Sequence, residues 1–69
     1  MRALIKIDPE ELIMARLNKG WSIRKLEIES KVSRSTIIRL ERGDSYAEKY
    51  TLSKLAKALN CSAEKLKGE

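Results

Sequence analysis

Residues 22–43 read SIRKLEIESKVSRSTIIRLERG and predict two short helices joined by a tight turn. Ser22 and Ser33 each stand where a helix N-cap is expected, because a serine hydroxyl accepts hydrogen bonds from the free amides of a first helical turn. Each serine also follows an apolar residue that has an apolar partner five positions further on, which is the spacing of a hydrophobic staple. These pairs are Trp21 with Leu26 and Val32 with Ile37. The connection near residues 30–32 is short, which suits a helix-turn-helix.

The second of these helices, residues 34–42, is basic. It carries Arg34, Ser35, Arg39 and Arg42 around Ile37 and Leu40, and it stops at Gly43. We expect the two apolar residues to be buried and the arginines to point outward. A short, capped helix that bears arginines and rests on a partner helix is typical of proteins that read the major groove of DNA.

The bulk properties of the chain favour a small nucleic-acid-binding domain. Its 69 residues predict a single domain, residues 1–69, near the lower size limit for a self-sufficient core. A net charge of +5 and a pI near 9.6 favour nucleic acid as a partner first and an acidic membrane surface second. Solubility alone is the other explanation of such a charge.

The composition also excludes several kinds of site. One cysteine and no histidine leave neither an internal disulfide nor a cysteine-based zinc site, so we expect no metal and no cofactor. No apolar run reaches the length of a membrane span, and the N-terminus is too weakly charged and too short in apolar residues for a signal peptide. We therefore expect a cytoplasmic protein without a membrane partner.

The segments before the central pair predict an arm and a first helix. Residues 1–7 form either an extended arm or a short strand. This segment either lies on the helical core or pairs with a second copy of the chain, and the position on the core is favoured. Asp8, Pro9 and Glu11 mark a helix start, with a capping aspartate and a proline in the first turn. The helix should end at Lys19, with Gly20 as its left-handed stop.

After the central pair, residues 44–49 predict a polar loop. Thr51 is expected to cap the next helix, with Tyr50 stapled to Leu55, and Asn60 to end it. Ser62 is expected to cap a last short helix, in which Cys61 serves as a small core residue. The fold class that follows is all-α, a compact five-helix bundle. Its predicted core residues are Leu12, Leu17, Leu26, Ile37, Leu40, Leu55 and Leu59.

With five helices placed, residues 9–67 resemble the phage-repressor family of DNA-binding domains, the Cro and lambda-repressor type also called XRE-like. The matching positions are Arg16, Gly20-Trp21-Ser22, Leu26, Val32-Ser33-Arg34-Ser35-Thr36-Ile37, Leu40-Glu41-Arg42-Gly43, Leu52, Leu55-Ala56-Lys57-Ala58-Leu59 and Ser62. The resemblance implies a helical bundle that binds double-stranded DNA, commonly as a homodimer on a two-fold-related operator. It also implies a structural ion pair between Arg16 and Glu41.

Three positions depart from the pattern of that family. Glu27 replaces a small alanine that usually packs between the two helices, so its carboxylate either leans into solvent or pairs with a neighbouring lysine or arginine. Lys31 replaces a glycine, and a left-handed lysine costs on the order of 1 kcal/mol. Ile23 replaces a glutamine that contacts phosphate, which makes Ile23 and Ile28 candidate surface residues for a partner protein.

The resemblance and the residue chemistry together assign the candidate DNA contacts. Base contacts are expected from Arg34, Ser35 and Arg39, because arginine can grip guanine O6 and N7 with two hydrogen bonds. Phosphate contacts are expected from Ser22, Ser33, Thr36, Arg42, Ser45, Tyr46 and Lys49. No catalytic residue is expected, because the chain has no histidine, no glycine-rich phosphate loop and no metal-ligand cluster.

Two functions remain open at this stage. The first is a sequence-specific DNA-binding regulator, most simply a repressor. The second is an antitoxin-like or adaptor module that binds a partner protein, with DNA binding secondary.

Overall fold

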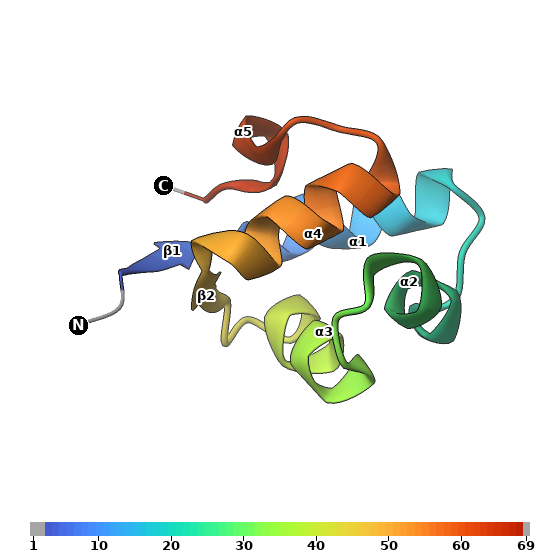
Figure 1. Ribbon diagram of the computed structural model, residues 1–69, viewed down its shortest axis with the longest axis horizontal. Helices are drawn as coiled ribbons and strands as arrows, with labels where there is room; N and C mark the ends of the chain where they lie inside the picture. The colour runs from blue at the N-terminus through green and yellow to red at the C-terminus, as the bar shows by residue number, and fades with distance from the viewer. Residues whose placement is uncertain (1–2, 69) are drawn as a thin grey trace.

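The protein is described by a computed structural model, which places residues 3–68. In chain order it contains β1 (Leu4–Lys6), α1 (Pro9–Asn18), α2 (Ile23–Ser30), α3 (Arg34–Glu41), β2 (Tyr46–Glu48), α4 (Lys49–Leu59) and α5 (Ala63–Leu66) (Figure 1). The expected helical bundle is confirmed, and a two-stranded antiparallel sheet is added to it. No helix within residues 3–68 is long and apolar enough to cross a bilayer.

The predicted helix caps are present. Asp8 accepts hydrogen bonds from the amides of Glu10 and Glu11 at the start of α1. Ser62 accepts from Lys65 N at the start of α5, over 3.2 Å. Gly20 follows α1 with a φ of +73°, and Asn60 ends α4 with a φ of +55°. These left-handed residues turn the chain out of each helix, as expected of C-terminal stops.

The segment expected to be a polar loop, residues 44–49, instead contains strand β2. It pairs with β1 in the register Leu4↔Glu48, Ile5↔Ala47 and Lys6↔Tyr46. Ala47 is buried and Ile5 packs against the core, so one face of this small sheet lies on the helices. Two isolated strands are not stable in water, and this apolar inner face supplies the missing stabilisation.

The N-terminal segment is held within its own chain. Ile7 N donates to Ser45 O over 2.7 Å on one side, and Gly68 N donates to Lys6 O over 2.8 Å on the other. Ile7 itself is fully buried. The favoured alternative, an arm laid on the core, is therefore confirmed for the described part of the arm, in which residues 4–6 pair with β2 and Ile7 is buried. The first two residues of the expected arm lie outside the described residues.

Helix α4 begins three residues earlier than predicted. Its N-cap is Glu48, with an extended φ of −71° and ψ of 151°, so Thr51 lies inside the helix and does not cap it. Tyr50 is 61% exposed, and its ring lies 4.5 Å from Lys54 Nζ instead of stapling the helix to Leu55. The reason is strand β2, which ends at Glu48 and leads directly into the helix.

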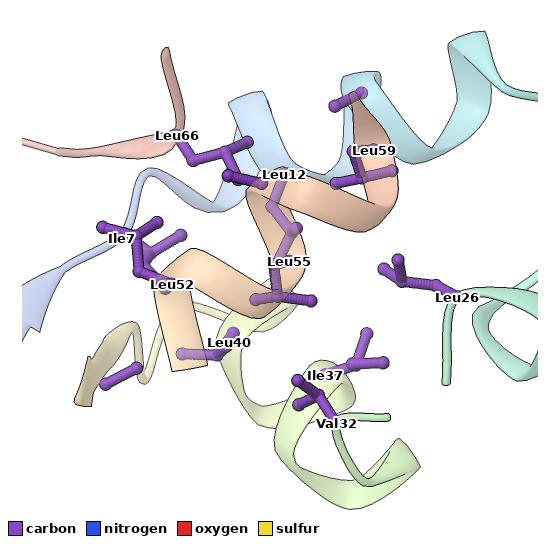
Figure 2. Packing of buried hydrophobic residues seen from close by; sticks show 13 residues of the cluster. Ile7, Leu12, Leu26, Val32, Ile37, Leu40, Leu52, Leu55, Leu59 and Leu66 are labelled. Atoms are coloured by element: carbon purple, nitrogen blue, oxygen red, sulfur yellow. The ribbon is translucent and has the colours of Figure 1, made fainter. Parts of the chain in front are cut away.

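The core is aliphatic and draws on every helix. Figure 2 shows its larger members, which are Ile7, Leu12, Leu26, Val32, Ile37, Leu40, Leu52, Leu55, Leu59 and Leu66. One predicted core residue is wrong: Leu17 is 53% exposed. It lies five residues after Leu12, about 140° around the helix, and therefore faces away from the core. Ala15 takes the buried position on α1.

Cys61 is half-buried and packs against the core, as expected of a small apolar residue. Burial raises the pKa of its thiol above the ordinary value, and the positive charge of Lys65 opposes that rise. The thiol therefore stays largely protonated near neutral pH, which disfavours nucleophilic chemistry.

Replacing Lys31 by glycine is expected to raise the free energy of unfolding by about 1 kcal/mol. Lys31 ends α2 with a φ of 61° and a ψ of 25°, a left-handed conformation in which its Cβ is crowded and a glycine is not. Urea denaturation measures the change. Asn60→Gly is the comparison, because asparagine tolerates a left-handed φ better than lysine and should gain less. An equal gain at both positions would contradict this explanation.

Candidate nucleic-acid interface

Helix α3 has one side in the core and one side in solvent. Ile37 and Leu40 are fully buried, and Figure 2 shows their side chains in the core. The helix lies at the lower edge of the molecule in Figure 1, with α1 and α4 above it. Arg34, Ser35 and Arg39 are all exposed. The structure thus puts the three predicted base-contact residues on the outside of the same helix.

Arg34 is the first residue of α3. Its guanidinium makes no hydrogen bond or ion pair with another side chain in the described part of the chain. The Ser35 hydroxyl lies 3.4 Å from Ser33 Oγ and is otherwise open to solvent. In a helix-turn-helix the N-terminal residues of the second helix contact base edges. Arg34 and Ser35 occupy that end of α3, so their placement suits base contact.

Arg39, in the last turn of α3, is partly engaged by the chain itself. Its Nη1 donates to the carbonyl oxygens of Asp44 at 3.2 Å and Tyr46 at 3.1 Å, and it lies 3.6 Å from the Asp44 carboxylate. A guanidinium has five N–H groups, and two of these are on Nη1. The donors on Nε and Nη2 are therefore left for a ligand, and the side chain is 41% exposed. The hydrogen bond from Arg39 to Tyr46 O also connects β2 to α3.

The two serines at the helix starts act as caps, as predicted. Ser22 Oγ accepts from Lys25 N over 3.0 Å at the start of α2. Ser33 Oγ accepts from Thr36 N over 3.3 Å and donates to Thr36 Oγ1 over 2.8 Å at the start of α3. Both serines are exposed and lie at ends that carry partial positive charge, which is where phosphates bind.

Of the remaining predicted phosphate contacts, Thr36 is half-buried and its hydroxyl is bonded to Ser33, and the other four divide into two groups. Arg42, Tyr46 and Lys49 are exposed and lie in the segment that connects α3 to the start of α4. Ser45 is only 2% exposed, so the prediction that its side chain contacts phosphate is wrong. The reason is the unforeseen strand pairing, since Ser45 O accepts the Ile7 amide and the residue is drawn inside.

Helix α3 is braced at its C-terminal end by the predicted ion pair. Arg16 Nε donates to Glu41 Oε2 at 2.8 Å and Arg16 Nη2 donates to Glu41 Oε1 at 3.0 Å. The third contact of the guanidinium is Nη1 to Trp21 O at 2.9 Å. The two charged side chains are only 12% and 9% exposed. One arginine therefore joins α1, the connection to α2 and the end of α3.

Glu27 has a partner that the sequence did not indicate. Within residues 3–68 its carboxylate does not pair with a lysine or arginine: Oε2 accepts the backbone N–H of Arg34 over 2.9 Å in an exposed hydrogen bond. The acceptor comes from α2 and the donor from the first residue of α3. No pattern within one helix predicts such a bond, because it depends on how the two helices are packed.

Ser30 is a second residue that the sequence reasoning missed. It is 4% exposed, and its hydroxyl donates to Leu26 O at 2.6 Å and accepts from Val32 N at 3.2 Å. It therefore satisfies a buried amide in the turn between α2 and α3. The pattern offered one weak signal, a serine just before a predicted helix end.

The two isoleucines considered as a protein-binding surface differ in burial. Ile28 is 55% exposed, but Ile23 is half-buried and packs against the core. The structure therefore leaves only Ile28 as an exposed apolar residue.

In the described part of the chain no three aspartate, glutamate or cysteine side chains are grouped so that they could hold a metal ion.

Comparison with known proteins agrees with this geometry. A family model described as Helix-turn-helix matches residues 12–66, most of the chain. No curated protein matches the sequence. The restriction-modification controller protein C.AhdI from Aeromonas hydrophila is similar in structure, with 30% identity, a TM-score of 0.77, and coverage of 83% of this chain and 86% of that one.

A second solved structure shares the fold. It is the N-terminal DNA-binding domain of SinR from Bacillus subtilis, with a TM-score of 0.77 and 23% identity. The similarity covers 81% of this chain and 83% of that one. The helices that carry the candidate interface thus have the same overall arrangement in both solved structures.

Proposed function

Because the chain belongs to the helix-turn-helix family of the phage-repressor, XRE-like type, we propose that it is a transcription regulator that binds double-stranded DNA in a sequence-specific manner. Helix α3 enters the major groove, and the protein acts as a repressor when its site overlaps a promoter. The similar C.AhdI is named a controller protein, and the similar part of SinR is named a DNA-binding domain, which supports this proposal.

The observation that carries the proposal is the contrast between the two sides of α3. Ile37 and Leu40 fix the helix to the core, and the pair of Arg16 with Glu41 fixes its last turn. The Arg34 guanidinium, at the other end, makes no hydrogen bond or ion pair within residues 3–68 and is exposed. A rigid helix with an unengaged arginine at its leading end suits recognition of guanine in the major groove.

The proposed contacts follow the positions of the side chains. Arg34, Ser35 and Arg39 face the bases, and Arg39 uses the donors that Asp44 and Tyr46 leave free. The phosphate contacts are Ser22, Ser33, Thr36, Arg42, Tyr46 and Lys49. Two copies bind as a homodimer on a two-fold-related operator, with half-sites about 34–36 Å apart.

The test is duplex binding over a salt series, with Arg34→Ala beside the wild type. A DNA reader loses affinity steeply with salt, with a log–log slope of about −0.9 per phosphate neutralised. Arg34→Ala is expected to cost about 1–3 kcal/mol of binding free energy and to relax the preference at one base position. Fluorescence anisotropy gives the affinities, and selection from a random duplex pool gives the base preference.

Lys65→Ala is the matched control. It also removes one positive charge, but from α5, at the opposite edge of the molecule from α3 in Figure 1. It should change affinity little. A flat salt dependence with no effect of Arg34→Ala would instead favour the protein-interaction module.

A further inference from the structure

Glu27 belongs to α2, but its carboxylate lies at the N-terminal end of α3, the end that we propose contacts the bases. Its Oε2 accepts the amide of Arg34, the first residue of that helix, over 2.9 Å. Thr36, two residues on, donates its amide to Ser33 Oγ. Two of the first three amides of α3 are therefore satisfied by side chains, one of them from another helix. A carboxylate is favoured in this position by the partial positive charge of a helix N-terminus.

Among the described residues, no cationic side chain neutralises the charge of Glu27. Three other carboxylates on or beside the helix-turn-helix have such a partner: Glu29 with Lys25 at 3.0 Å, Glu41 with Arg16 at 2.8 Å and Asp44 with Arg39 at 3.6 Å. Within residues 3–68, no lysine or arginine nitrogen lies within ion-pair distance of Glu27. Among the described residues this negative charge is thus paired only with a backbone amide, that of the arginine whose side chain is expected to read DNA.

We propose that Glu27 is an affinity-setting residue of the DNA interface, an inference that rests on the proposed function. Its carboxylate repels the phosphates of any duplex that α3 approaches and competes with them for the N-terminal end of the helix. The repulsion does not depend on base sequence, so it lowers non-specific binding and makes stable binding depend more on base contacts. The hydrogen bond to Arg34 N has a second role, which is to position the leading end of α3 against α2.

Glu27→Gln separates the two roles, because glutamine keeps a carbonyl oxygen for Arg34 N and loses the charge. Its affinity for a fluorescently labelled, mixed-sequence duplex is expected to rise about threefold to tenfold at low salt. The gain should shrink as salt is added, because screening removes the repulsion. The thermal midpoint should stay unchanged. Glu27→Ala also removes the acceptor, so it should bind more tightly than wild type but unfold at a lower temperature.

Glu29→Gln is the matched control, since it removes the same charge from the same helix without touching α3. It should raise affinity less than Glu27→Gln does. Equal effects of the two glutamine variants, or no gain in Glu27→Gln and Glu27→Ala, would overturn the inference. The proposed function is tested separately by the wild type and Arg34→Ala. If the wild type binds no duplex, both the proposed function and the inference about Glu27 are wrong. If the wild type binds, and Arg34→Ala weakens binding while Glu27→Gln leaves it unchanged, only the inference about Glu27 is wrong.

Discussion

Replacing Arg16 by alanine is expected to lower the free energy of unfolding by about 3–5 kcal/mol, because it leaves the Glu41 carboxylate buried without a partner. The pair is bidentate, with distances of 2.8 and 3.0 Å, and both side chains are nearly inaccessible. The substitution also removes the bond to Trp21 O. In a domain of this size the loss is a large fraction of the total stability. Urea denaturation followed by circular dichroism measures it.

The exposed pair of Lys25 and Glu29 provides the control for that experiment. Its members lie 3.0 Å apart in adjacent turns of α2, with side chains 48% and 41% exposed. Lys25→Ala should therefore cost at most about 1 kcal/mol. If Arg16→Ala cost no more than Lys25→Ala, the pair would not act as a brace. Changing Arg16 and Glu41 together to methionine and leucine should restore part of the loss, because no unpaired charge is then buried.

The second large effect is expected from Ile37→Ala, at about 2–5 kcal/mol of unfolding free energy. Ile37 is fully buried and points from α3 into the core (Figure 2). Truncation removes its contacts and leaves a cavity under the middle of the proposed reading helix. Differential scanning calorimetry should show a lowered midpoint.

Ile28→Ala makes the same chemical change at a surface position. Ile28 is 55% exposed, so its truncation should alter stability by at most about 0.5 kcal/mol. The pair of variants thus tests burial at constant residue type. Similar costs at the two positions would mean that α3 is not anchored through Ile37.

Much of this fold could be predicted from the sequence, because the signals concerned are local. Ser22 and Ser33 cap helices through amides three residues away, and Gly20 and Asn60 end helices through their own backbone conformation. The burial of Ile37 and Leu40 and the exposure of Arg34 follow from the helical period. Such features need no knowledge of the rest of the chain.

Most of the predictions that failed depend on a distant partner. The pattern of residues 44–49 predicts a loop, because strand β2 forms only by pairing with β1, which lies near the N-terminus. The burial of Ser45 and the early start of α4 are consequences of that pairing. Leu17 is the exception, because its exposure follows from its own position about 140° around α1 from Leu12 and needs no distant partner.

The sequence by itself determined where the helices start and stop and which side of α3 is basic, because caps, turns and periodicity act over a few residues. Only the tertiary structure decided which of those polar groups are already engaged. It places Arg39 against Asp44 and Tyr46, and it places Glu27 on the first amide of α3. The physical reason is that such a bond needs its two groups within about 3 Å, and only the packing of separate elements sets that distance.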